Sequence, residues 1–237
     1  SVMEFSVKKA KGRVKLVFGC GSNCTAHAEK AAKKAEEIGA DGLLAVTPYY
    51  NKCTQNGLVA YYESICNAVN IPVIAYNVPS RTGVNILPAT MERLAEIPNM
   101  AGIKDAGGNM AQTMETLRLL RGKCDLYSGE DALNLPILAV GGDGVISVVS
   151  NLVPADVKRM YTAIKAGKTE EAYALNDKIL PLTQTCFIEV NPIPAKAAMD
   201  LMGLKAGVPR APLTEIEAAN KEKLRAAMLA YGLEVNA

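Results

Sequence analysis

The chain has 237 residues, of which 49% are hydrophobic and 21% are charged, and its formal net charge is +2. These values are ordinary for a soluble globular protein, and so weak a charge does not favour binding to nucleic acid or to an anionic membrane. No stretch approaches the ~18 consecutive apolar residues of a membrane-spanning helix. The opening residues, SVMEFSVKKAKGR, are charged and amphipathic, so we do not expect them to be a signal peptide.

The cysteines and the histidine predict neither disulfides nor a metal site. Six cysteines are scattered through apolar or helical segments, which favours reduced thiols in a cytoplasmic protein. The chain has one histidine, His27, and the pair Cys20-x3-Cys24 has no second pair of ligands to complete a tetrahedral site. We therefore expect no metal.

Short β-branched runs alternate with longer helical patterns through the first part of the chain. The first helical pattern has Thr25 before it and Gly39 after it, which are residues typical of helix ends. Strands that are apolar on both faces and separated by helices predict a parallel sheet with covering helices. The runs that read as strands are residues 14–18, 42–46, 72–76, 101–104, 125–128 and 144–149.

The pattern changes after residue 152, where four helical patterns follow one another with no strand between them. The sequence thus predicts an α/β fold with six βα units in residues 1–152 and helices in residues 153–237. An open doubly wound sheet accommodates six strands, whereas a TIM (β/α)8-type barrel needs eight. Because the opening resembles the back half of a helix, we favour a barrel whose first two βα units are missing from this sequence.

Polar side chains at the carboxyl ends of the strands are the candidate site residues, because active sites of such folds lie there. Lys104 ends the fourth strand beside an apolar interior. Desolvation there disfavours the ammonium form, and a neutral amine can attack a carbonyl to form a Schiff base. A lysine that simply points to water is the alternative.

Tyr76 ends the preceding strand, so its side chain can lie ~5 Å from that of Lys104. A phenol beside the amine can relay protons during Schiff-base formation, although a water-exposed tyrosine is equally common. Arg81 follows on a loop between Pro79 and Gly83, and its planar fork suits a carboxylate. Tyr49 and Tyr50 could form a lid, an active-site phenol or an anchor at a subunit contact.

Two glycine-rich segments are weaker signals. Residues 19–24, GCGSNC, resemble a dinucleotide loop, but the third glycine is missing and the next strand does not end in an acid. Gly107-Gly108 and residues 141–144 could cradle phosphate or could serve only as turns.

With Tyr76, Arg81 and Lys104 assembled, the sequence resembles the dihydrodipicolinate synthase family of pyruvate-dependent aldolases. YNVPSRTG is the specific motif, because the related neuraminate lyases keep the tyrosine but lack the arginine. The matching motifs run in family order across essentially the whole chain: TPYYN (47–51), YNVPSRTG (76–83), GIKDA (102–106), SGED (128–131), GVISV (144–148) and NPIPAK (191–196).

The resemblance implies that Lys104 forms a Schiff base with pyruvate, with no other cofactor, and that the enamine attacks L-aspartate 4-semialdehyde. The product would be 4-hydroxy-tetrahydrodipicolinate, an intermediate of diaminopimelate and lysine biosynthesis. Tyr76 would relay protons together with Tyr50 of a neighbouring subunit in a homodimer or homotetramer. Arg81 would bind the semialdehyde carboxylate, and the positions matching the pyruvate pocket are Gly129 and Ile146.

Two departures from the family pattern qualify these expectations. Asn23 and Tyr49 match an inhibitory lysine site, but His27 stands where many inhibited relatives have glutamate. The family also normally begins with two βα units, the second of which carries a GTTGE-like loop that holds the pyruvate carboxylate. We therefore expect an incomplete pocket and weak or absent activity. The alternatives are a related aldolase acting on a sugar acid or another aldehyde, and a non-catalytic relative that forms oligomers.

Overall fold

The computed structural model describes residues 2–236 as two compact units. The first unit comprises the chain up to residue 130 together with residues 140–145, and the second comprises residues 131–139 and the chain from residue 146. The domain division predicted after residue 152 stays a prediction.

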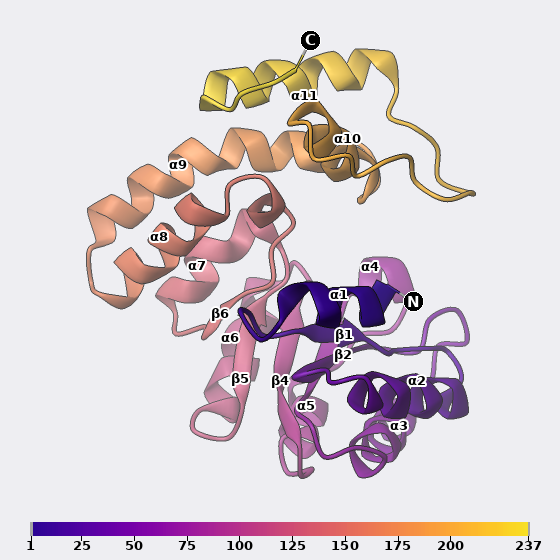
Figure 1. Cartoon of the computed structure of the whole chain (residues 1–237). Coiled ribbons are helices and arrows are strands. Elements are labelled where there is room, and N and C mark those ends of the chain that lie inside the picture. The colour runs from indigo at the N-terminus through magenta and orange to yellow at the C-terminus, as the bar shows by residue number, and fades with distance from the viewer. Residues whose placement is uncertain (1, 237) are drawn as a thin grey trace. The chain divides into compact units, whose positions relative to one another are not determined.

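The first unit contains a parallel sheet of six strands in sequential order, with each strand beside the next one in the chain (Figure 1). Within the described residues, the first and last strands each have one strand neighbour. This is the topology of consecutive βα units, as predicted. The strands are β1 (Val17–Gly19), β2 (Gly42–Val46), β3 (Val73–Asn77), β4 (Met100–Asp105), β5 (Asp125–Ser128) and β6 (Gly144–Val145).

Helices of the first unit cover one face of this sheet. Along that face α2 packs on α3, α3 on α5 and α5 on α6, and α6 contacts β5 (Figure 1). Burial alternates along β3 accordingly, because successive side chains of a strand point to opposite faces. The covering helices are α2 (Thr25–Glu37), α3 (Gln55–Asn67), α5 (Pro88–Leu94) and α6 (Met110–Leu120), and the unit also contains α1 (Val2–Ala10) and α4 (Pro79–Thr82).

The second unit is helical. Helix α8 packs on α9, and α11 packs on both α9 and α10. Its elements are η1 (Asp131–Leu133), α7 (Asn134–Ala139), η2 (Val149–Asn151), α8 (Pro154–Lys165), α9 (Thr169–Cys186), α10 (Ile193–Leu201) and α11 (Ala218–Tyr231). The four helical patterns predicted after residue 152 are confirmed. Among the residues that the structure describes, no helix combines the length and apolarity needed to cross a bilayer.

The sixth strand is shorter than the sequence predicts. The apolar run 144–149 predicts a strand to its end, but β6 stops at Val145 and a 3-10 helix begins at Val149. The backbone N–H groups of Val148 and Val149 both donate to Oδ2 of Asp131, at 2.8 Å each. Both N–H groups are thus turned to one carboxylate rather than to opposite sides as in a strand, so the prediction of a strand up to residue 149 was wrong.

The predicted start of helix α2 was wrong, and its predicted end was correct. Thr25 is the first helical residue rather than the residue before the helix, and the preceding Cys24 makes no side-chain cap bond. Gly39 does end the helix, because its φ of +92° places it in the left-handed region that glycine adopts most readily. Its N–H donates to the Glu36 carbonyl at 2.9 Å.

Candidate active site

Lys104 and Tyr76 are brought together by the register of β3 and β4. The ladder pairs Tyr76 with Lys104, and the Lys104 amine lies 4.2 Å from the centroid of the Tyr76 ring. Both side chains are half-buried, on the face of the sheet opposite the covering helices. The predicted juxtaposition of amine and phenol is thus what the structure contains.

Three features of its surroundings shift the pKa of the Tyr76 phenol. Burial raises the pKa of the phenol above its ordinary value of 10.0, and the carboxylate of Glu130 acts in the same direction. The positive charge of Arg81 opposes them by lowering the pKa. A protonated phenol can donate a hydrogen bond or a proton to a group held beside Lys104.

Arg81 lies in the last turn of α4, with an exposed side chain. It borders an open depression of about 450 Å³ at the carboxyl ends of the first three strands, and Tyr76 lies in the wall of the same depression. The two polar side chains therefore face one space that is otherwise largely apolar. The residues that line it are Gly19, Gly21, Leu44, Val46, Tyr49, Tyr76, Val78, Arg81 and Thr82.

Buried hydroxyls hold α4, the helix that carries Arg81, against the sheet. Thr47, just past β2, donates to the Thr82 hydroxyl at 3.1 Å. Thr82 Oγ1 lies 3.0 Å from the Val84 carbonyl oxygen, and its backbone carbonyl accepts from the Tyr50 N–H at 3.3 Å. The α4 turn and the rim loop with the two tyrosines are therefore tied to each other.

The position of Gly21 shows why glycine occurs in residues 19–24, the segment that resembles a dinucleotide loop. A Cβ atom there would lie 2.4 Å from the Val46 nitrogen, so this position must be glycine for the loop to pass over β2. The glycine thus serves a close backbone approach within the first unit.

Gly129 directly follows β5, and its N–H donates to the carbonyl of Asp105 at 2.8 Å. This bond places Gly129 at the same end of the sheet as Lys104. Ile146 directly follows β6 and belongs to the second unit. The predicted roles of both residues in a pyruvate pocket stay predictions.

The remaining candidates lie on rim segments of the first unit. Tyr49 lines the depression, whereas Tyr50 is 89% exposed and has a left-handed φ of +75°. The carbonyl of Asn23 accepts from the Asn51 side chain at 2.9 Å, and His27 is an exposed residue of α2. Their predicted parts in a proton relay and in an inhibitor site stay predictions.

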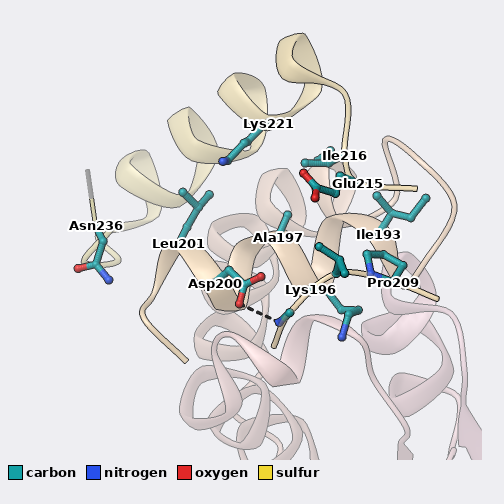
Figure 2. Close-up of a pocket in the computed structure, with 12 residues that line it drawn as sticks. Ile193, Lys196, Ala197, Asp200, Leu201, Pro209, Glu215, Ile216, Lys221 and Asn236 are labelled. Atoms are coloured by element: carbon teal, nitrogen blue, oxygen red, sulfur yellow. Dashed lines mark hydrogen bonds between the residues drawn. The ribbon is translucent and has the colours of Figure 1, made fainter. Parts of the chain in front are cut away.

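The second unit has a cavity of its own, of about 290 Å³, between α10, α11 and the segment that joins them (Figure 2). Two of its polar side chains, Lys196 and Asp200, hold that segment. Lys196 donates to the carbonyl of Ala206, and Asp200 Oδ1 accepts from the Gly207 N–H at 3.0 Å, as the dashed line marks. These two bonds fix the segment that joins α10 and α11 over the cavity.

Asn77 and Asp105 directly follow Tyr76 and Lys104 at the strand ends, and the sequence predicts no role for either. They pair in register one step beyond Tyr76 and Lys104, and both are buried. A signal for them was present in the alternation along each strand, which turns every second side chain toward the helices.

Comparisons with known proteins agree with this geometry. The model of the family described as "Dihydrodipicolinate synthetase family" matches residues 1–231. A 4-hydroxy-tetrahydrodipicolinate synthase from Caldicellulosiruptor bescii is 49% identical over 234 residues, which cover 99% of this chain and 79% of the relative.

Solved structures give the same result. The crystal structure of dihydrodipicolinate synthase from Aquifex aeolicus has a TM-score of 0.97 and 40% identity, and the match covers 100% of this chain and 81% of that one. The chloride-inhibited enzyme from Acinetobacter baumannii, complexed with pyruvate, has a TM-score of 0.94 and 40% identity, with 98% of this chain and 80% of that one covered. The chain spans about four fifths of these relatives, and it belongs to the dihydrodipicolinate synthetase family.

Proposed function

We propose that Lys104 is the residue on which this chain performs the reaction of its family. That reaction is the one of 4-hydroxy-tetrahydrodipicolinate synthase, a lyase of the diaminopimelate and lysine biosynthesis pathway that uses pyruvate. The family forms a Schiff base between a lysine and pyruvate and needs no dissociable cofactor. The observation that carries the assignment is the Lys104 amine, half-buried and 4.2 Å from the Tyr76 ring.

The chemistry requires an amine, a proton relay and a carboxylate receptor. The neutral amine of Lys104 attacks the C2 carbonyl of pyruvate, and loss of water leaves an imine. Loss of a proton from C3 gives an enamine, whose carbon attacks the aldehyde of L-aspartate 4-semialdehyde. Cyclisation through the amino group of the semialdehyde then displaces Lys104 and returns the free enzyme.

Tyr76 is the group best placed to move protons during imine formation. Its phenol borders the depression beside the Lys104 amine, so it can release its proton to the departing hydroxyl and accept the proton that the attacking amine loses, which leaves the phenol unchanged overall. Arg81, on the wall of the same depression, is the receptor for the semialdehyde carboxylate, because guanidinium binds carboxylate through two parallel hydrogen bonds.

Tyr50 supports a proposal about assembly. Its side chain is 89% exposed in the isolated chain, and its backbone is held in a left-handed conformation beside α4. We assign it to the proton relay of a neighbouring subunit in a homodimer or homotetramer, in the cytoplasm. Asn23, His27 and Tyr49 are proposed to border an inhibitory lysine site at that subunit contact.

Borohydride trapping tests the assignment of Lys104. The protein is incubated with pyruvate and borohydride, and the mass of the intact chain and the modified peptide are measured. We expect one reduced adduct on Lys104, none in Lys104→Ala, and an unchanged yield in Lys34→Ala, a control at an exposed lysine of α2. An adduct on another lysine, or none in the unmodified protein, would refute the assignment.

Turnover with aldehydes completes the test. L-aspartate 4-semialdehyde is expected to be preferred over the aldehyde product of a sugar-acid cleavage, and the reverse preference would favour the alternative aldolase. The expectation of weak activity stays a prediction, which the turnover number from the same assay measures.

A further inference from the structure

A buried hydrogen-bond cluster centred on Asp105 lies behind the reactive pair. Asp105 directly follows Lys104 in β4, so its side chain points to the opposite face of the sheet, toward α6. The residue is 5% exposed. A carboxylate in such a position is costly to bury unless its oxygens accept hydrogen bonds, and this one has several donors.

The donors come from three different segments. The Thr113 hydroxyl of α6 donates to Oδ2 of Asp105 at 2.6 Å. The Gly107 N–H, in the loop before α6, donates to Oδ1 at 3.0 Å, and the Asn77 amide of β3 donates to the same oxygen at 3.4 Å. The bond from Thr113 has the shortest donor–acceptor distance of the three, and hydrogen bonds to an ionised carboxylate become stronger as this distance shortens.

Through the main chain, the cluster is linked to Tyr76 on one side of Lys104 and to Gly129 on the other. Asn77 pairs with Asp105 where Tyr76 pairs with Lys104, one residue earlier. The Asp105 carbonyl accepts from the Gly129 N–H at 2.8 Å. A displacement of Asp105 would therefore move Lys104 relative to the phenol on one side and to Gly129 on the other.

Asn77 is also held by hydrogen bonds to residues other than Asp105, so its position does not depend on Asp105 alone. Its Oδ1 accepts from the Ile86 N–H at 2.9 Å, and its amide donates to the Asn85 side chain at 2.9 Å. The Asn85 amide in turn donates to Gln112 of α6 at 2.7 Å. Helix α6 thus holds β3 through Asn85 and β4 through Thr113.

We propose that Asp105, held in place by its hydrogen bond with Thr113, is a positioning residue. It orients the Lys104 amine toward the substrate carbonyl. The proposal rests on the assigned role of Lys104 in Schiff-base formation. Neither Asp105 nor Thr113 contacts the substrate in this arrangement, since both side chains lie on the helix-covered side of the sheet. The orientation of the amine matters because a displacement of a reacting group by ~1 Å can lower the rate ~100-fold.

Substitutions at Thr113 test the positioning role of Asp105, and Thr116, one turn further along α6, is the matched control. Thr113 and Thr116 are 1% and 4% exposed, but the Thr116 hydroxyl donates to the backbone carbonyl of Gln112 at 2.9 Å. Thr113→Val and Thr116→Val thus remove the same group from the same helix, and only the first deprives Asp105 of a partner. Thr113→Ala is a second deletion of that hydroxyl, and Thr113→Ser restores it.

The readouts are the rate of borohydride trapping at saturating pyruvate, the pyruvate concentration giving half that rate, and the free energy of unfolding. Thr113→Val and Thr113→Ala are expected to slow trapping at least ~10-fold while the half-saturating concentration changes less than ~2-fold. Thr113→Ser should trap within ~2-fold of the unmodified protein. Thr116→Val should lose stability but keep its trapping rate.

The two proposals fail in different ways. Unmodified protein that does not trap pyruvate would refute the role of Lys104. Trapping by the unmodified protein, with Thr113→Val or Thr113→Ala as fast as Thr116→Val, would overturn the positioning role of Asp105. A Thr113→Ser protein as slow as Thr113→Val would also overturn it, because the restored hydroxyl would then have no effect.

Discussion

A Cβ atom on Gly129 would lie 2.7 Å from Cε of Lys104 and 2.8 Å from its Cγ. Real Cβ atoms do not approach other carbons so closely, so any side chain at this position displaces the lysine. Gly129→Ala should therefore slow trapping by pyruvate ~10-fold or more, because the amine can no longer point at the carbonyl. Gly57→Ala, at the start of α3, is the control and should trap normally. Equal rates in the two variants would contradict this account of Gly129.

The two tyrosines that flank Lys104 should differ sharply in importance. The register pairs Lys104 with Tyr76 on one side and with Tyr127 on the other. The Tyr127 hydroxyl donates to Asp125 at 2.6 Å, toward the start of β5, so it is directed away from the carboxyl end. Tyr76→Phe should slow trapping ~100-fold, whereas Tyr127→Phe should change it less than ~3-fold. A comparable loss in both would show that the phenol of Tyr76 has no special role.

Arg81 should discriminate between the two substrates. Arg81→Lys keeps the charge but loses the planar fork, so binding of the semialdehyde carboxylate weakens. We expect KM for L-aspartate 4-semialdehyde to rise ~10-fold or more, with pyruvate trapping unchanged within ~2-fold. Steady-state kinetics with each substrate varied in turn measure the split. An equal effect on pyruvate trapping would place Arg81 in the first half-reaction instead.

Buried thiols should make the first unit sensitive to alkali. Burial raises the pKa of Cys66 to about 12 from its ordinary value of 9.0. An unfolded chain ionises this thiol from pH 9, but the folded chain does not, so its stabilising effect is complete below pH 9 and is lost as the pH rises toward 12. The free energy of unfolding should fall by about 1.4 kcal/mol per pH unit for this thiol within that interval.

Denaturant unfolding between pH 8 and pH 11 measures the slope. Cys66→Ala should be less stable at neutral pH, but its stability should fall less steeply above pH 9. Cys24 is exposed, so Cys24→Ala should keep the slope of the unmodified protein. A Cys66→Ala slope equal to that of Cys24→Ala would show that Cys66 does not contribute.

The sequence by itself determined most of the element order. The strand predicted over residues 42–46 is β2 to the residue, and α9 is one of the helices predicted after residue 152. Such segments are readable because apolar periodicity and β-branched composition are local properties. The sequence also placed Tyr76 and Lys104 at successive strand ends, where a parallel sheet must bring them close.

Only the tertiary structure decided which polar groups meet across elements. The stop of β6 at Val145 depends on Asp131, which lies far enough back in the chain that no local pattern reveals the contact. The alternation along β4 turns Asp105 to the face opposite Lys104, but only the fold brings Thr113 within hydrogen-bond distance of its carboxylate. Hydrogen bonds between distant segments are set by packing and register, which is why the partners of these two carboxylates follow from the fold and not from the local sequence.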